Sequence, residues 1–126
     1  MSLIVQAPAF VTGAAAITLT VGKNGLAAAY AAANGRAFAI LGVYVHLDIA
    51  PVSAGSVIVT AMPSYGTTEY DTVMVSDSLV GLTDWYWAPA KPVVLSAMDD
   101  VNVAYANPDG STVGVTVQWA QANGGV

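Results

Sequence analysis

The chain has no cysteine and only one histidine among its 126 residues. Without cysteine there is neither a disulfide framework nor thiolate chemistry. A zinc site needs three or four ligands, and His46 has no second histidine or cysteine to join it. A serine triad also depends on a histidine, and the chain has no Gly-x-Ser-x-Gly elbow. We therefore expect no enzyme activity, no catalytic residues, no metal site and no cofactor.

Charge is also scarce. Charged residues make up 9% of the chain, against about 25% in ordinary globular domains. The three basic residues, Lys23, Arg36 and Lys91, are scattered and face eight acidic ones, so they cannot form the basic patch that nucleic-acid binding requires. Hydrophobic residues make up 56%. A surface this poor in charge is most simply covered by other subunits, and we expect an obligate assembly.

Long hydrophobic runs are missing too. The longest uncharged apolar run after Arg36 covers residues 37–45, far short of the roughly 20 residues that span a membrane. No basic residue precedes Lys23, so the basic start of a secretory signal is absent. We expect no membrane contact, and a protein that stays where it is made or leaves as part of a particle.

What the chain does contain is apolar alternation with a period of two, the mark of half-buried strands. The last third, residues 82–119, shows it best, with residues 101–105 and 113–119 each placing their apolar side chains on one face. Between these runs lies the turn Asn107-Pro108-Asp109-Gly110. The pattern predicts a terminal β-hairpin with the aromatic segment 84–89 beside it.

Further strands are predicted at residues 3–5, 17–21, 36–49, 57–62 and 70–75. Residues 26–33 are ambiguous: their alanines favour a helix, but Asn-Gly pairs flank them, and we favour a strand or extended loop. Turn signals recur about every ten residues, which is typical of an all-β sandwich or barrel. We predict one domain over residues 1–126: an antiparallel, jelly-roll-like β-sandwich of about eight or nine strands, with residues 1–12 as a candidate extended arm.

The strand at residues 36–49 has two apolar faces. Ala37, Ala39, Leu41, Val43, Val45 and Leu47 share the face assigned to the core, while the other face is apolar in its middle and ionisable at its ends. A mixed outer face is typical of a subunit contact. The predicted interface therefore combines this face with the N-terminal arm and the indoles: Leu3, Ile4, Val5, Phe10, Phe38, Ile40, Tyr44, Trp85 and Trp87.

Three sets of polar residues are candidates for chemistry. His46 could pair with Asp48, two residues along the same strand face. Asp99 and Asp100, with Asp109 or Asp48, could bind calcium through carboxylate oxygens, although the Asp-x-Asp-x-Asp-Gly spacing is absent and turn aspartates commonly bond the backbone. Glu69 and Asp71 share a strand face, which seldom gives the carboxylate pair of a glycosidase. We favour structural roles for all three.

The tryptophans have two interpretations. Trp85 and Trp87 point to one side of a strand and Tyr86 to the other. Aromatic side chains dominate core energetics and anchor interfaces, which is the interpretation we favour. The alternative is that the exposed indoles stack on sugar rings, as in a carbohydrate-binding module.

The segment Gly81-Leu82-Thr83-Asp84-Trp85-Tyr86-Trp87-Ala88-Pro89 resembles a stretch found in small structural proteins of tailed bacteriophages. The similarity extends to residues 69–73, 92–95, 101–107 and 114–119, so it takes in about the second half of the chain. It implies a jelly-roll-like virion protein that sits as a homotrimer on the outer capsid surface and cements neighbouring major capsid proteins. Some related jelly rolls belong to tails or fibres instead. Cementing is done by surfaces, so the resemblance transfers no functional residues.

Overall fold

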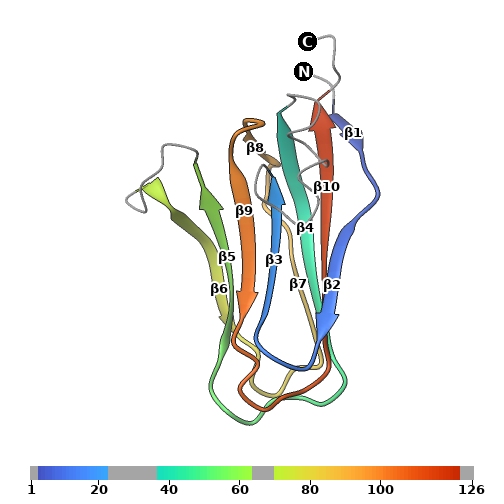
Figure 1. Cartoon of the computed structure of the whole chain (residues 1–126), viewed down its shortest axis with the longest axis vertical. Helices are drawn as coiled ribbons and strands as arrows, with labels where there is room; N and C mark the ends of the chain where they lie inside the picture. Colours follow the sequence, from blue (N-terminus) through green and yellow to red (C-terminus); the bar gives the residue numbers. More distant parts are fainter. Residues whose placement is uncertain (1–2, 23–36, 64–69, 123–126) are drawn as a thin grey trace.

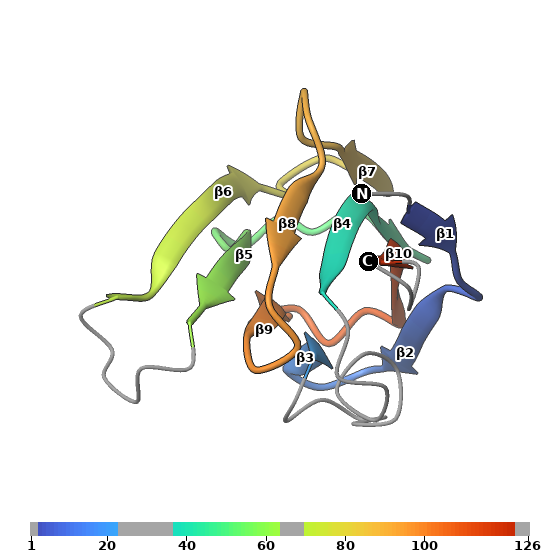
Figure 2. The ribbon, with the colours of Figure 1, turned by 90° about the horizontal axis from the view of Figure 1, so that it is seen from above.

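The protein is a sandwich of two antiparallel β-sheets (Figure 1, Figure 2), as the alternation predicts. The computed structural model describes residues 3–22, 37–63 and 70–122. The predictions for residues 26–33 and for Glu69 lie outside these ranges. The described strands are β1 (Leu3–Val5), β2 (Ala9–Gly13), β3 (Ile17–Gly22), β4 (Phe38–Leu47), β5 (Ser56–Met62), β6 (Thr72–Ser78), β7 (Asp84–Trp87), β8 (Val93–Leu95), β9 (Asp100–Tyr105) and β10 (Val113–Ala122).

The strand order is that of a jelly roll. One sheet has the order β1-β10-β4-β7, with β2 also on β10 and β8 also on β4, and the other has the order β3-β9-β5-β6. The described residues form ten strands rather than eight or nine because both edges of the first sheet are interrupted. Pro8 separates β1 from β2, and Pro89 and Pro92 separate β7 from β8. Proline has no N–H for the ladder and is confined to such edges.

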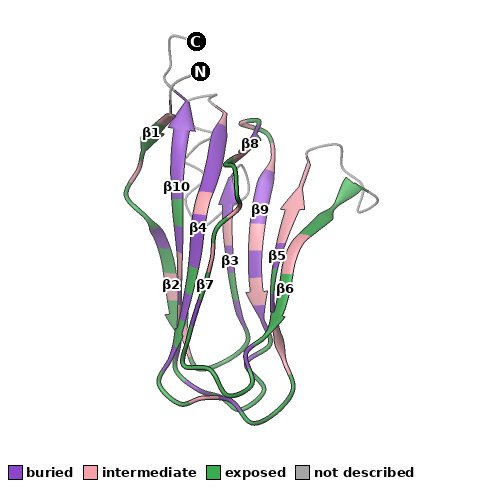
Figure 3. Ribbon diagram, turned by 180° about the vertical axis from the view of Figure 1, so that it is seen from behind, coloured by how far each residue is buried: buried purple, intermediate pink, exposed green. Residues whose placement is uncertain are grey.

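The core lies between the two sheets, and valine is its most frequent residue. Figure 3 shows buried residues concentrated in β10, β4 and β9, while β6 is largely exposed. The alternating runs of the last third face inward as predicted: Val101, Val103, Tyr105, Val113, Val115, Val117 and Trp119 each expose 2% or less. β-branched residues suit this role because they pack well on a pleated surface.

The predicted terminal hairpin is wrong. Strand β9 pairs with β3 and β5, whereas β10 pairs with β4 and with β1 and β2 in the other sheet. The aromatic segment β7 lies beside β4, not beside either strand. The turn at Asn107 and Gly110, both with positive φ, therefore crosses from one sheet to the other. Asn107 fixes this crossing, since its Nδ2 donates to the carbonyl oxygens of Ala15 and Ser111.

Strand β4 contains a β-bulge that reverses the predicted faces of its first half. Gln118 pairs with Gly42, but the next residue, Trp119, pairs with Ile40, which leaves Leu41 as the extra residue. A bulge shifts the alternation by one position. Val43, Val45 and Leu47 face the core as predicted, but Phe38 and Ile40 do so as well, each with 0% exposure. Their assignment to the outer face is therefore wrong.

The N-terminal residues lie on the chain's own sheet. Residues 3–5 pair with residues 120–122 of β10, and Gln6 N donates to the carbonyl oxygen of Trp119 at 3.0 Å. The indole Nε1 of Trp119 in turn donates to the carbonyl oxygen of Ala7 at 3.0 Å. Of the two predicted roles for residues 3–5, an edge strand or an arm on a neighbour, the structure shows the first.

Candidate functional site

The outer face of the six-stranded sheet carries a row of aromatic side chains. Phe10 on β2, Thr116 on β10, Tyr44 on β4 and Tyr86 on β7 are successive cross-strand partners. The three aromatic residues are exposed to solvent: 72% for Phe10, 48% for Tyr44 and 49% for Tyr86. We call these four residues the aromatic row. It is the clearest candidate for a binding surface on this sheet.

The two tyrosines form a platform. Their ring centroids lie 4.3 Å apart with an interplanar angle of 39°. Tyr86 also lies across Gly42, where an added Cβ would come within 2.7 Å of the Tyr86 hydroxyl oxygen and 3.0 Å of Gln118 Oε1. The absence of a side chain at residue 42 therefore allows Tyr86 to lie close to the sheet.

A polar row runs beside the aromatic row. It consists of Thr12, Gly114, His46 and Asp84, again as successive cross-strand partners. His46 Nδ1 lies 2.7 Å from Asp84 Oδ1, and this hydrogen bond is the main reason that the pKa of Asp84 falls below its ordinary value of 3.8. Both side chains are largely exposed, so the pair adds little to stability.

Asp48, the partner considered for His46 in the sequence, has another contact. Its Oδ1 accepts a hydrogen bond from the backbone N–H of Thr112 at 2.9 Å. Asp109 Oδ2 accepts from the N–H groups of Val52 and Ser53, and Asp99 Oδ2 accepts from Ser96 N. The interpretation of these aspartates as backbone acceptors is confirmed. Within the described ranges, no three potential metal ligands cluster.

The indoles point inward and Tyr86 points outward, in agreement with the alternation. Trp85 is 8% exposed, and its Nε1 donates to Asp77 Oδ2 at 3.0 Å. Trp87 is half-buried and packs against the core. Trp85 is buried and Trp87 is partly buried, so neither is the exposed indole that the alternative of a sugar platform at these two residues requires. Tyr44 and Tyr86 form an exposed aromatic pair on this sheet. Tyr44 was among the predicted interface residues, but its contact with Tyr86 was not predicted.

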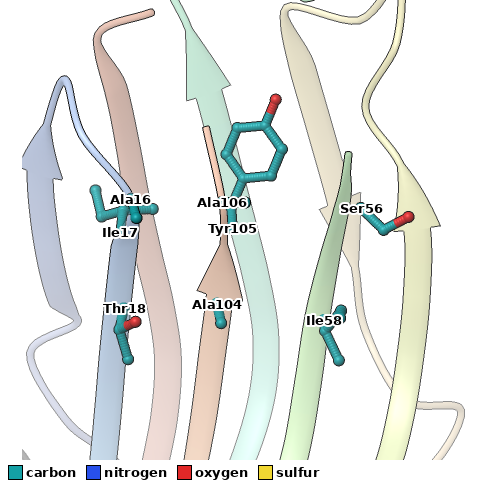
Figure 4. A pocket seen from close by; sticks show the side chains of 8 residues that line it. All are labelled: Ala16, Ile17, Thr18, Ser56, Ile58, Ala104, Tyr105 and Ala106. Atoms are coloured by element: carbon teal, nitrogen blue, oxygen red, sulfur yellow. The ribbon is translucent and has the colours of Figure 1, made fainter. Parts of the chain in front are cut away.

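The outer face of the other sheet contains a hollow of about 400 Å³ (Figure 4). Its centre is Ala104 on β9, whose cross-strand partners are the longer side chains Thr18 on β3 and Ile58 on β5. Ala16, Ile17, Ser56, Tyr105 and Ala106 complete the lining. We call it the Ala104 hollow. The sequence signal was a small residue at an outward position of a central strand, but alternation alone does not show which residues flank it.

The predicted interface residues are divided by the fold. Ile4, Val5, Phe10 and Tyr44 are exposed and Leu3 is half-buried, so they remain candidates for contacts with other subunits. Phe38 and Ile40 have no exposed surface to offer. Trp85 belongs to the core and Trp87 lies partly in it. Tyr86 and the exposed Val94 on β8 were missed as candidate contact residues.

No protein-family model matches the chain, and no curated protein matches it in sequence. Among residues 3–22, 37–63 and 70–122, no helix is long and apolar enough to cross a membrane. The fold and the surface define the class: a jelly-roll β-sandwich with an exposed aromatic row on one sheet and a hollow on the other.

Proposed function

We propose that the protein is a structural virion protein, a cement or decoration protein on the outer capsid surface of a tailed bacteriophage. It stabilises the head by packing against other copies of itself, as a homotrimer, and against the major capsid protein. The observation that carries the proposal is the exposed aromatic row on a chain with very little charge. The resemblance of residues 81–89 to small phage structural proteins supports it from the sequence side.

The chemistry of the row favours a protein partner. Phe10 is 72% exposed, and its side chain has no polar atom that could form a hydrogen bond with water. Burying a phenylalanine side chain fully contributes about 1.5–3 kcal/mol. Aromatic residues are also the most frequent anchors of protein interfaces. Ile4 and Val5, 47% and 72% exposed on the neighbouring β1, add to the apolar surface along the same edge.

A cement protein stabilises a shell by mass action. A partner that binds only the assembled shell shifts the equilibrium by RT ln(1 + [L]/Kd), about 2.7 kcal/mol at a concentration of 100 Kd. Chemical catalysis is not required for this role. Large complementary surfaces are required, and obligate interfaces are both larger and more apolar than transient ones.

The test is binding to capsids assembled from the major capsid protein of the same virion, measured by co-sedimentation. Wild type is expected to sediment with the shells and Tyr44→Asp is expected to remain in solution. Val52→Asp is the matched control, because Val52 is 85% exposed in a loop away from the row. Wild type that stays in solution, or Tyr44→Asp that binds as wild type does, would reject the proposal.

A second function is favoured by the tyrosine platform. Tyr44 and Tyr86 lie beside Gln118 and the His46–Asp84 pair, and aromatic faces with nearby hydrogen-bonding groups suit sugar rings. The protein would then be a carbohydrate-binding module or a tail or fibre component that contacts the host surface. A glycan screen distinguishes the two, since specific binding that Tyr86→Ala abolishes would favour this alternative.

A further inference from the structure

Strand β6 forms an edge of the four-stranded sheet, since β5 is its only partner among the described strands. It lies at the outer side of the sandwich (Figure 1, Figure 2). An edge strand offers unpaired backbone N–H and C=O groups, to which a strand of another chain can add. Prolines interrupt the edges of the other sheet, but the seven residues of β6 include neither proline nor lysine. Such an edge pairs with other copies unless another feature prevents it.

The carboxylate of Asp77 points toward the inside of the sandwich. Its cross-strand partner Val57 is 0% exposed, and cross-strand partners share one face of a sheet. Trp85 on the opposite sheet indicates the same direction, because its Nε1 donates to Asp77 Oδ2 at 3.0 Å. Asp77 is nevertheless exposed, since it lies at the open edge between the sheets. A charged residue therefore occupies an inward position at which the alternation with Val75 favours an apolar one.

A strand added to β6 would remove this carboxylate from water. It would extend the inner face of the sheet beyond Asp77, and its side chains would cover the open edge. Burying a carboxylate without an opposite charge is strongly unfavourable. A second copy of β6 brings no opposite charge, because the strand contains no basic residue and each chain has a net charge of −5. It would bring a second carboxylate instead.

A β-bulge acts in the same direction as the charge. Val59 pairs with Val75, but the next residue of β5, Thr60, pairs with Val73, which leaves Met74 as the extra residue of β6. A bulge bends its strand and increases the local twist, so a straight strand cannot follow β6 over its whole length. Bulges and inward-pointing charges are both means by which sheet edges are kept from pairing.

We infer that Asp77, together with the bulge at Met74, keeps strand β6 from pairing with β6 of other copies. The hydrogen bond from Trp85 holds the carboxylate at the open edge, where an added strand would cover it. The inference goes beyond the proposed function, which concerns the outer face of the other sheet. It explains how a chain with 9% charged residues leaves an edge strand without proline or lysine and does not assemble through it.

Three variants separate the charge of Asp77 from its hydrogen bond. Asp77→Val removes both, Asp77→Asn removes the charge but keeps an oxygen that can accept from Trp85, and Trp85→Phe removes the bond but keeps the charge. Turbidity and thioflavin T fluorescence of the folded protein follow edge-to-edge assembly. Asp77→Val should assemble at least about tenfold faster than wild type, because a buried charge no longer opposes pairing. Asp77→Asn should also be faster than wild type, and Trp85→Phe should match wild type.

A rescue variant completes the test. Ser76 is exposed on the same strand, and Ser76→Lys added to Asp77→Val should return the assembly rate to that of wild type, because an edge lysine opposes pairing. The inference fails if Asp77→Val assembles no faster than wild type, or if the added lysine does not slow it. It also fails if Trp85→Phe assembles as fast as Asp77→Val, since lost stability would then be the cause. Capsid binding is a separate measurement, in which Asp77→Asn should match wild type.

Discussion

The indole Nε1 of Trp85 donates a hydrogen bond to Asp77 Oδ2 at 3.0 Å, and this bond joins the two sheets at one edge. Trp85 is on β7 of the six-stranded sheet and Asp77 on β6 of the other. Leu79, fully buried, lies in the connection between these strands. An edge of a sandwich is open to water unless long side chains close it, and Trp85 does so here.

Replacing Trp85 should therefore show how much this edge contributes to the free energy of unfolding. Trp85→Phe keeps most of the apolar contact but removes the hydrogen bond, so the free energy of unfolding should fall by about 1 kcal/mol. Trp85→Ala leaves a cavity as well and should cost about 3–5 kcal/mol. Urea unfolding followed by circular dichroism measures both. Equal stability of Trp85→Phe and wild type would show that the bond contributes nothing.

Tyr105 should tolerate loss of its hydroxyl. Its side chain is 2% exposed, and its hydroxyl oxygen has no hydrogen-bond partner within the described part of the chain. A buried polar atom without a partner is costly, so Tyr105→Phe is expected to leave stability unchanged or raise it by up to about 1 kcal/mol. Tyr44→Phe, on the exposed face, is the control. A loss above about 1 kcal/mol in Tyr105→Phe would indicate a contact that the structure does not show.

Tyr105 should also make the stability of the protein depend on pH in the alkaline range. Burial, and secondarily the charge of Asp109, raises the pKa of Tyr105 above its ordinary value of 10.0. The unfolded chain then loses its tyrosine proton at lower pH than the folded chain does, so stability falls as pH rises above 10.0. This fall should be smaller in Tyr105→Phe, as urea midpoints over that pH range would show. Parallel pH curves would contradict it.

Asp109 should have the opposite effect in the acid range, where stability falls as the pH is lowered. Hydrogen bonds from the Ser53 hydroxyl, then from the backbone N–H groups of Ser53 and Val52, lower its pKa below the ordinary 3.8. Its contribution is therefore present above pH 3.8 and is lost as pH falls through the lower, folded-state pKa. The stability difference between wild type and Asp109→Asn should shrink over that range. A difference that does not vary with pH would exclude a role for the charge.

Gly42 should control the tyrosine platform. A methyl group at residue 42 would lie 2.7 Å from the Tyr86 hydroxyl oxygen and 2.9 Å from its ring carbon Cε1, so Gly42→Ala is expected to displace that side chain and weaken capsid binding. Because the exposed ring can move, stability should change by less than about 1 kcal/mol. Gly114→Ala is the matched control on the same face, since nothing lies within 4 Å of its added Cβ. Unchanged Tyr86 NMR shifts in Gly42→Ala would refute this.

Alternation predicted the core-facing residues of β9, β10 and the second half of β4, but it failed for Phe38 and Ile40 and did not show which strands pair. The apolar faces of β9 and β10 are as predicted, but both strands bury the same kind of face, and nothing local shows that they belong to different sheets. The change of face at Leu41 could not be predicted from the sequence, because a β-bulge depends on how β4 is aligned with β10. His46 and Asp84 meet across 38 residues of sequence, a distance over which spacing rules carry no information.

The place of β10 in the sheet has a consequence for biosynthesis. This strand comes last among those described, yet it lies inside its sheet, between β4 on one side and β1 and β2 on the other. Before β10 has been synthesised, β1 and β2 cannot join the sheet, and the edge of β4 that pairs with β10 is unpaired. All-β sandwiches already fold slowly, in milliseconds to seconds, and unpaired strand edges favour aggregation meanwhile. Completion of this sheet must therefore follow translation of residues 113–122, and a nascent chain stopped before them would expose the inner faces of β4 and β2.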